Sequence, residues 1–323
     1  MKIAIIGAGA LGLYYGSLLA RHSPGTGVRV TFLGRSDYDV LRERGIIVHS
    51  IRGDFRLENL NVVKEPEQLG KQHLIIIGLK ATSNASLRNL LLPAITPSTA
   101  VLTLQNGLGN EEHLSDFLPP KQILGGAAFL CSNRIGPAEI LHTDYGAVSI
   151  APFSPQCVVA AETLADIFKA SSIECTAESN LLEVRFRKQV WNVPFNTLCT
   201  IHDAPTSHIL SSEDLLLQTQ RIMREIVELG RVANQKRNSD WNIQRSFSLS
   251  EETVSGMIEK TRTMGDYLPS MLLDRRAGRA LESQSIVYNC LSWRDQYASE
   301  LPLAEVSLLS EKLRALEATG STY

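Results

Sequence analysis

The chain is poor in cysteine, and its cysteines lack the spacing of a disulfide framework or a zinc site. Five cysteines occur in 323 residues, an odd number, and no two form a C-x-x-C pair. The seven histidines are scattered, without the H-E-x-x-H spacing of a metal-binding helix. We therefore expect free thiols, a reducing cytoplasmic location and no protein-bound metal.

An excess of one charge and a long apolar run are also missing. Lys and Arg number 32 against 34 Asp and Glu, so no basic surface for nucleic acid or anionic lipid is indicated. No apolar run reaches the roughly 18 residues that a membrane span needs. The N-terminal run MKIAIIGAGALG has its glycines too early for a signal peptide. We expect neither nucleic acid nor a membrane as a partner.

The first half of the chain alternates strand-like with helix-like segments. Its short apolar runs, rich in β-branched residues, lie at 3–6, 28–33, 74–79, 99–104 and 123–130. Helical spacing occupies 11–21, 36–44, 84–92 and 110–117. This alternation predicts a doubly wound α/β domain with a buried parallel sheet. Residues 139–151 instead predict an antiparallel hairpin at the sheet edge, with Asp-Tyr-Gly as its turn.

The second half changes to helical spacing without a convincing strand. Apolar residues recur at helical intervals over 181–201, 212–237, 250–264 and 270–299. The fold class is therefore α/β, with an N-terminal Rossmann-type doubly wound sheet followed by an all-α domain. We place the nucleotide-binding domain at 1–178 and the helical domain at 179–323, and expect the tail 318–323 to fray.

A glycine-rich turn follows the first strand directly and opens the first helix. It reads Gly7-Ala8-Gly9-Ala10-Leu11-Gly12, the G-x-G-x-x-G pattern of dinucleotide-binding folds. The first glycine permits the tight turn, the second lets a pyrophosphate approach, and the third allows close packing of helix and strand. A tight turn that binds nothing is the structural alternative, but the strand-turn-helix context favours a dinucleotide.

The end of the second strand indicates which dinucleotide. NAD-binding folds place a carboxylate there for the ribose 2′-hydroxyl. Here the strand is followed by Gly34-Arg35-Ser36, and the nearest carboxylate, Asp37, comes one residue later. Arg35 and a hydroxyl suit a 2′-phosphate, so we expect NADP(H) as the cofactor.

A polar column occupies an otherwise apolar helical segment. In KQVWNVPFN, Lys188, Asn192 and Asn196 are four residues apart and share one helix face. Apolar neighbours desolvate a lysine and lower its pKa, which suits a general acid. Pro194 removes one helix hydrogen bond and is expected to bend the helix.

Together these motifs resemble the ketopantoate reductase (2-dehydropantoate 2-reductase) family over nearly the whole chain. The resemblance rests on GAGALG at 7–12, Arg35, GLKA at 78–81, LQNGLGN at 104–110, the column at 188–196 and PSMLLDRRAGRALE at 269–282. It implies reduction of 2-dehydropantoate (ketopantoate) to pantoate by NADPH in pantothenate and coenzyme A biosynthesis, with Lys188 as general acid and Glu282 completing the catalytic site.

The resemblance also assigns the remaining site residues. Asn192, Asn196 and Ser270 would bind substrate. Lys80 and Asn106 would lie at the carboxyl ends of sheet strands beside the nicotinamide, with Asn106 also near substrate. Glu282 would reach the cofactor ribose.

Each of these side chains also has a structural interpretation. Lys188 could be a surface lysine, and the two asparagines could bind backbone near the proline. Ser270 could cap a helix. Glu282 could pair with Arg279. Lys80 could simply close a strand, and Asn106-Gly107 could be a turn.

Three places depart from the family pattern at the substrate end, namely Tyr267, Tyr288 and residues 202–210. Two alternatives therefore stay open: a reductase of another small 2-keto acid, like the β-hydroxyacid or opine dehydrogenases, and a non-catalytic NADP-binding sensor. The oligomeric state is open too, with a homodimer as one possibility.

Overall fold

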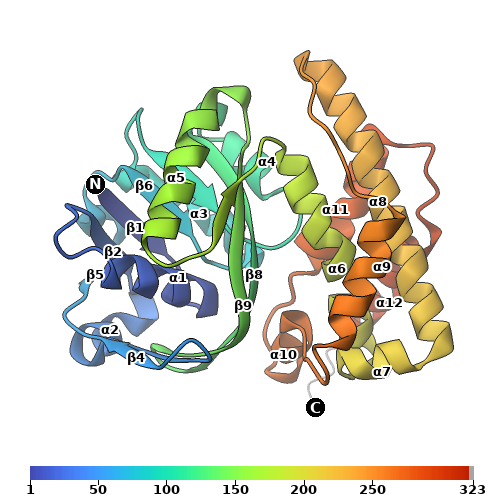
Figure 1. Cartoon of the computed structure of the whole chain (residues 1–323), viewed down its shortest axis with the longest axis horizontal. Helices are drawn as coiled ribbons and strands as arrows, with labels where there is room; N and C mark the ends of the chain where they lie inside the picture. Colours follow the sequence, from blue (N-terminus) through green and yellow to red (C-terminus); the bar gives the residue numbers. More distant parts are fainter. Residues whose placement is uncertain (320–323) are drawn as a thin grey trace. The chain divides into compact units, whose positions relative to one another are not determined.

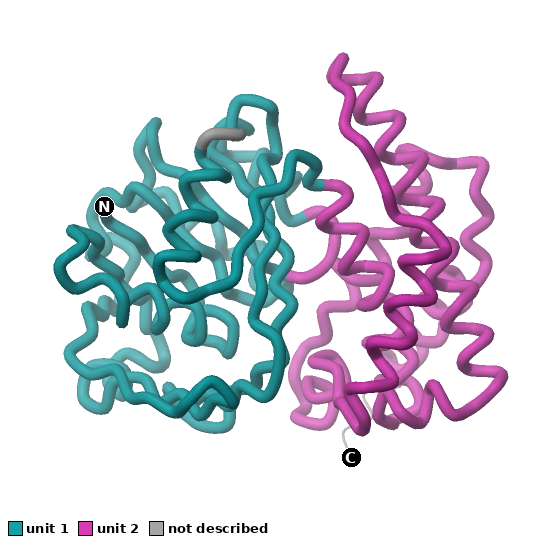
Figure 2. The backbone as a smooth tube through the Cα atoms, in the orientation of Figure 1, with its two compact units in different colours: residues 1–105, 110–181 teal, residues 106–109, 182–323 magenta. Residues whose placement is uncertain are grey.

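The computed structural model describes residues 1–319, apart from the side chains of 158 and 159. These residues form two compact units (Figure 2). The first comprises 1–105 and 110–181, and the second 106–109 and 182–323. The short loop 106–109 therefore belongs with the helical unit, although it follows a strand of the sheet. Of the tail expected to fray, 318–323, Ala318 ends a helix and 320–323 lie outside the described residues.

The first unit is built on one ten-stranded sheet (Figure 1). Nine strands follow the order β4-β3-β9-β8-β7-β6-β1-β2-β5, and β10 pairs with β9. Their bounds are β1 Lys2–Ile6, β2 Arg29–Leu33, β3 Ile46–Ser50, β4 Phe55–Leu57, β5 Asn61–Val63, β6 Leu74–Ile77, β7 Ala100–Thr103, β8 Ile123–Gly136, β9 Glu139–Pro152 and β10 Cys175–Ala177. The five predicted parallel-sheet strands are all present. Four short strands, β3, β4, β5 and β10, were not predicted.

The centre of this sheet is parallel and buried. β1 pairs in parallel with β2 and β6, and β7 pairs in parallel with β6 and β8. Helices of the unit are α1 Ala10–Arg21, α2 Tyr38–Arg44, α3 Leu87–Leu91, α4 Asn110–Ser115 and α5 Val158–Ala170. Short 3₁₀ segments are η1 Arg35–Asp37, η2 Pro66–Leu69, η3 Ala81–Ser86, η4 Leu92–Ala94, η5 Pro120–Gln122 and η6 Pro155–Cys157. This arrangement brings the segments that follow β1, β2, β6 and β7 to one edge of the sheet.

The prediction of an edge hairpin over 139–151 is wrong. These residues form most of β9, a single strand that pairs antiparallel with β8 and parallel with β3 and β10. Tyr145 and Gly146 do adopt positive φ values of 61° and 125°. They produce an irregularity in the ladder, because the register shifts opposite Phe129 and Leu130. Pairing partners on both sides of β9 keep the chain extended through a local turn signal.

The second unit is helical, and no strand occurs between residue 182 and residue 319. Its elements are α6 Leu181–His202, α7 Thr206–Ser211, α8 Glu213–Trp241, α9 Glu251–Arg262, α10 Ser270–Arg276, the π-helix η7 Gln284–Tyr288, α11 Asn289–Tyr297 and α12 Ala304–Ala318. The helix expected over 270–299 is therefore interrupted. Helices α7 and α12 were not predicted.

A single apolar core holds these helices together. Of the residues at helical spacing in α8, Ile222, Ile226, Leu229 and Ala233 are fully buried in it, and Val232 is partly buried against it. Helix α6 continues through Pro194 and presents Val190, Val193 and Phe195 to the same core. The predicted fold class, a Rossmann-type sheet followed by a helical region, is confirmed. None of the helices in residues 1–319 is long and apolar enough to cross a membrane.

Candidate functional site

The glycine loop between β1 and α1 uses its three glycines differently. Gly7 has φ +117°, and a Cβ there would lie 2.6 Å from Leu79 N. At Gly12 a Cβ would lie 2.0 Å from Gly7 O. Both positions are therefore closed to side chains by the turn and by packing. At Gly9 a Cβ would meet only Gly78 O, at 3.8 Å. Protein packing does not explain the missing side chain at Gly9, whereas close approach of a ligand would.

The first turn of α1 is free of side-chain caps. Gly9 is the N-cap residue, with φ −85° and ψ −179°, and no side chain within residues 1–319 makes a cap hydrogen bond there. The first turn also contains no acidic residue. Backbone N–H groups at such an end carry partial positive charge and attract anions. Ala8, Ala10 and Leu11 line this loop beside the glycines.

Lys80 follows β6 by three residues, as Asn106 follows β7. Because Ile77 pairs with Thr103 at the ends of these parallel strands, both residues leave the same edge of the sheet, as predicted. Lys80 is half-buried and precedes η3. The segment is fastened by Asn84, which donates to Asn110 at 3.0 Å and accepts from Gln105 at 2.8 Å.

Arg35 stands directly after β2 in an unusual conformation. Its φ is +39°, in the left-handed region that non-glycine residues rarely adopt. The side chain is exposed and makes no hydrogen bond or ion pair with any residue of the 1–319 range. An arginine kept in a strained position without an internal partner indicates a role toward a ligand.

Sequence reasoning missed Arg134, which reaches this region from β8. Its Nη2 lies 3.0 Å from Asp37 Oδ1 and 2.9 Å from Oδ2. Its Nη1 lies 3.5 Å from Ala8 O in the glycine loop, and its Nε donates to Gly136 O at 3.1 Å. No motif marks this arginine, because Asp37 and Ala8 are 97 and 126 residues away from it in the chain.

The polar column of α6 is formed as predicted from its spacing. Asn192 and Asn196 are 3% and 2% exposed, and Asn196 Nδ2 donates to Asn192 Oδ1 at 3.3 Å. Asn192 Nδ2 is buried and has no hydrogen-bond partner among the described residues. An unsatisfied buried donor of this kind costs about 1–3 kcal/mol, so a ligand acceptor would be favourable.

Asn196 is more fully engaged than Asn192. Its Oδ1 accepts from Met271 N at 3.1 Å and from Ser270 Oγ at 3.4 Å. It thereby satisfies backbone at the start of α10, where the N-cap residue Pro269 supplies no side-chain bond. Ser270 is the first helical residue and not the cap, so that structural alternative is wrong. Ser270 and Asn192 are nevertheless both held by Asn196.

Lys188 begins the column and is half-buried. Arg187, the cation next to it in the chain, forms an ion pair with Glu183 at 2.9 Å. Gln189, on the other side, donates to Ile286 O in η7 at 2.8 Å. Both neighbours are therefore committed to structural contacts within the helical unit.

Asn106 and Glu282 meet although 176 residues separate them. Asn106 Nδ2 donates to Glu282 Oε2 at 3.1 Å, and Glu282 is 4% exposed. The alternative pairing of Glu282 with Arg279 is wrong, because Arg279 instead binds Asp274 at 2.9 Å.

The π-helix η7 packs against the loop that carries Asn106 and is hydrogen-bonded to it. Asn289 N–H donates to Gln284 O, five residues back, and the Ser285 carbonyl accepts from Leu108 N–H at 2.8 Å. Asn289 Nδ2 also donates to Leu108 O at 2.6 Å. A Cβ at Gly107 would lie 2.3 Å from the Ser285 carbonyl, so only glycine fits. Helical irregularities of this kind are frequent at functional sites.

Two departures from the family pattern have local explanations. Tyr288 donates to Glu317 at 2.5 Å and lies under Arg314, which joins η7 to α12. Tyr267 packs against Trp191 with ring centroids 6.0 Å apart, and Trp191 is next to Asn192 in the chain. Tyr288 therefore serves packing, whereas Tyr267 adds an aromatic ring close to the column.

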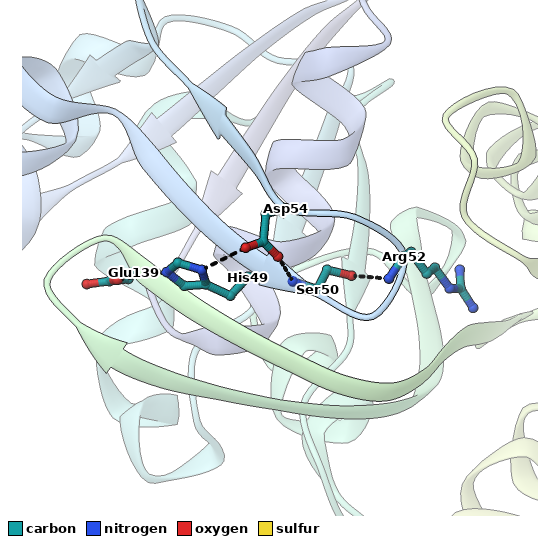
Figure 3. A network of polar contacts seen from close by, with 5 residues as sticks. All are labelled: His49, Ser50, Arg52, Asp54 and Glu139. Carbon is teal, nitrogen blue, oxygen red and sulfur yellow. Dashed lines mark hydrogen bonds and ion pairs between the residues drawn. The ribbon is translucent and has the colours of Figure 1, made fainter.

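A separate polar network lies on the first unit (Figure 3). His49 contacts Asp54 at 3.2 Å and Glu139 at 2.9 Å, while Asp54 accepts from the backbone of Ser50. The hydrogen bond to Glu139, followed by that to Asp54, raises the pKa of His49 above its ordinary value. Within residues 1–319, no three His, Cys, Asp or Glu side chains are arranged to hold a metal ion. We interpret the network as a fastening of the β3–β4 hairpin to β9.

Comparison with known proteins decides the family. Residues 3–155 match the family model described as ketopantoate reductase PanE/ApbA, and residues 180–316 match its C-terminal model. The chain belongs to the ketopantoate reductase family. The resemblance expected from the motifs is thereby confirmed, and so is an enzyme of the oxidoreductase class.

Individual ketopantoate reductases agree over the full length. A 2-dehydropantoate 2-reductase from a Nostoc species is 32% identical, with 99% of this chain and 97% of the relative covered. The crystal structure of 2-dehydropantoate 2-reductase from Geobacter metallireducens is 36% identical, with a TM-score of 0.90 and coverage of 98% and 100%. A D-mandelate dehydrogenase solved with NADH and anilino(oxo)acetate shares the fold, with 23% identity, a TM-score of 0.86 and complete coverage of both chains.

Proposed function

We propose that this protein reduces 2-dehydropantoate to pantoate with NADPH, as a step of pantothenate and coenzyme A biosynthesis in the cytoplasm. The observation that carries the proposal is the buried Asn192 Nδ2, which has no hydrogen-bond partner within residues 1–319 and lies one helical turn from Lys188. Family membership supports the reaction class, and the polar column supports a small, oxygen-rich substrate on the helical unit.

The cofactor side of the proposal rests on the glycine loop. The open space at Gly9 and the uncapped start of α1 fit a pyrophosphate. Arg35 would pair with the 2′-phosphate of NADPH, and Lys80 would approach the nucleotide from the end of β6. When bound, the reduced nicotinamide supplies the hydride that reaches the carbonyl carbon of the substrate.

Lys188 supplies the proton in this proposal. As the carbonyl carbon gains a hydride, the C=O π electrons move to oxygen, which becomes negative. The ammonium of Lys188 stabilises that charge and transfers a proton to it, leaving a neutral amine that is reprotonated from solvent. The product carries a C–OH group in place of the carbonyl.

Substrate orientation falls to the amides and to Ser270. Asn192 Nδ2 has an unused donor for a carboxylate or hydroxyl oxygen of the substrate. Asn196 fixes Asn192 from one side and Ser270 from the other, so it would act chiefly by positioning. Amides make these contacts without adding charge, which leaves the field of Lys188 undiminished.

Glu282 and Asn106 form the second part of the proposed centre. In this arrangement Asn106 holds one carboxylate oxygen of Glu282. The carboxylate would accept from ribose or substrate hydroxyls. The π-helix and Gly107 support both residues, because they hold the 106–109 loop against the segment that follows Glu282.

A second candidate substrate is a 2-oxo acid with a larger apolar group. One observation favours it: Tyr267 packs on Trp191 beside the column, where family members commonly have a polar residue three positions before the serine. An aromatic surface would suit a branched or aromatic side chain better than a hydroxymethyl group.

The proposal is tested by following NADPH oxidation against a panel of 2-oxo acids. The panel contains 2-dehydropantoate, branched aliphatic 2-oxo acids and phenylglyoxylate. We expect the highest kcat/KM for 2-dehydropantoate. A higher kcat/KM for a bulkier acid would identify that acid as the preferred substrate. Tight NADPH binding without reduction of any acid would support a sensor. Light scattering on the same sample distinguishes a monomer from a homodimer.

A further inference from the structure

We infer that Arg134 determines the choice between NADPH and NADH, by neutralising Asp37 and adding a second cation beside Arg35. The inference rests on the proposed nucleotide-binding function of the first unit. It goes beyond that function because it assigns cofactor selectivity to a residue on β8, remote in the chain from the glycine loop and from the end of β2.

The first step concerns Asp37. It is the nearest carboxylate to the end of β2, the position from which NAD-binding folds bind the ribose 2′-hydroxyl. Its side chain is 6% exposed, and Arg134 lies within 3.0 Å of both carboxylate oxygens. Ser36 Oγ donates to Oδ1 at 3.3 Å. Asp37 is thus buried and ion-paired, and its Oδ2 has no hydrogen bond among the described residues but is enclosed, so it is unavailable to a ribose hydroxyl.

The second step concerns charge. A carboxylate this buried is costly unless it is paired, so Arg134 also permits Asp37 to be there. Arg35, Asp37 and Arg134 together carry a formal charge of +1 (two cations and one anion). Without Arg134 the sum would be zero, and a 2′-phosphate would face an unpaired carboxylate. The pair therefore converts a position suited to NAD into one suited to NADP.

The third step concerns the donors that remain. A guanidinium has five N–H groups. In Arg134 they are directed at Gly136 O, Ala8 O and the Asp37 carboxylate, and the side chain is still 38% exposed. At least one Nη1 proton remains for a phosphate oxygen. The 3.5 Å contact to Ala8 O also fixes the guanidinium against the loop that would hold the pyrophosphate.

A purely structural role makes a different prediction. If Arg134 only joined β8 to the glycine loop and to Asp37, its loss would weaken both dinucleotides equally. If it selects the cofactor, its loss weakens the binding of NADPH and leaves that of NADH unchanged or tighter, because the freed carboxylate can accept from the 2′-hydroxyl.

The test measures dissociation constants of the intact chain for NADPH and NADH by isothermal titration calorimetry, without substrate. For Arg134→Gln we expect NADPH binding about tenfold weaker and NADH binding unchanged or tighter. In Asp37→Asn, NADPH binding should stay within about twofold and NADH binding should not improve. The double variant should lose the gain in NADH affinity. Titration with 2′,5′-ADP and 5′-AMP repeats the comparison without the nicotinamide.

The outcomes separate this inference from the function on which it rests. Equal weakening of NADPH and NADH by Arg134→Gln, at an unchanged thermal unfolding midpoint, overturns the role of Arg134 and leaves the proposed function standing. Equal affinity of the unmodified protein for both nucleotides also overturns it. Failure of the unmodified protein to bind either nucleotide overturns the proposed function itself. If Arg134→Gln does not fold, the double variant, which leaves no unpaired carboxylate, still tests the expected loss of NADPH affinity.

Discussion

The glycine loop of the first unit and the polar column of the second are built by opposite means. The loop works through missing side chains: Gly9 leaves space that no protein atom fills closely. The column works through side chains that are already engaged, since Asn196 makes contacts with Asn192, Ser270 and Met271. One is a local turn, whereas the other depends on residues about 75 positions apart.

This difference separates two kinds of sensitivity to substitution. A local turn should tolerate changes elsewhere but not an added methyl group. In a buried polar column, the effect of substituting a residue should depend on which hydrogen bonds its side chain already makes within the protein. Variants within each region therefore show whether a residue serves the ligand or the fold.

The largest expected effect comes from Lys188→Ala. Removing the proposed proton donor should lower kcat by about 10²–10⁴-fold, the usual contribution of general acid–base catalysis. NADPH affinity, measured by calorimetry, should change little because Lys188 is assigned to the substrate. Arg187→Ala serves as the matched control, since that cation already pairs with Glu183. Retention of full activity by Lys188→Ala would refute its catalytic role.

The second largest effects are expected from the two asparagines, and they should differ in kind. Asn192→Ala removes an amide whose Nδ2 is unpartnered, so KM for the 2-oxo acid should rise about 10- to 100-fold while the unfolding midpoint is kept. Asn196→Ala removes the acceptor that satisfies Met271 N, so the free energy of unfolding should fall by about 1–3 kcal/mol. Urea unfolding and steady-state kinetics on both variants provide the measurement. Equal loss of stability would show that both asparagines serve the fold.

Two glycines of the loop show the same contrast between ligand binding and folding, with smaller expected effects. Gly9→Ala meets only Gly78 O at 3.8 Å, so it should fold normally and weaken NADPH binding about tenfold. Gly12→Ala would place a Cβ 2.0 Å from Gly7 O, so the protein should lose about 1–3 kcal/mol even without nucleotide. Thermal unfolding with and without NADPH distinguishes them. Unchanged NADPH affinity in Gly9→Ala would remove the pyrophosphate from this loop.

The smallest effect concerns pH and lies outside both regions. The pKa of His49 is raised above its ordinary 6.5, so its stabilisation is complete below that value and is lost as pH rises through the raised value. Hydrogen bonds from Ser50 and His49 lower the pKa of Asp54 below 3.8, so its contribution is lost as pH falls through the lowered value.

His49→Gln should therefore lower the urea midpoint most between about pH 4 and 6.5, and least near pH 9. Burial lowers the pKa of His142, but this residue is present in both the unmodified protein and His49→Gln, so it does not contribute to the difference between them. A midpoint difference independent of pH would show that the His49 network does not titrate as inferred.

Much of the fold was predictable because its signals are local. The apolar runs of β1, β2, β6 and β7 could be recognised without their partners, since strands buried on both faces have continuous apolar sequences. Residues 139–151 could not. Tyr145 and Gly146 resemble a turn, and only pairing with β3, β8 and β10 shows that β9 continues through them. The helix expected over 270–299 ends instead at Arg276, and Gly278 just beyond it adopts φ 63°, a local helix end that the apolar spacing alone does not show.

By itself, the sequence determined the glycine turn, the alternation of strands and helices, and the four-residue spacing of Lys188, Asn192 and Asn196, because each depends on neighbouring residues and on backbone geometry. Only the tertiary structure decided that Asn196 is satisfied while Asn192 Nδ2 is not, that Asn106 meets Glu282, and that Arg134 covers Asp37. Those outcomes depend on partners roughly 75–180 positions away, and no local pattern records which distant group occupies a buried hydrogen bond.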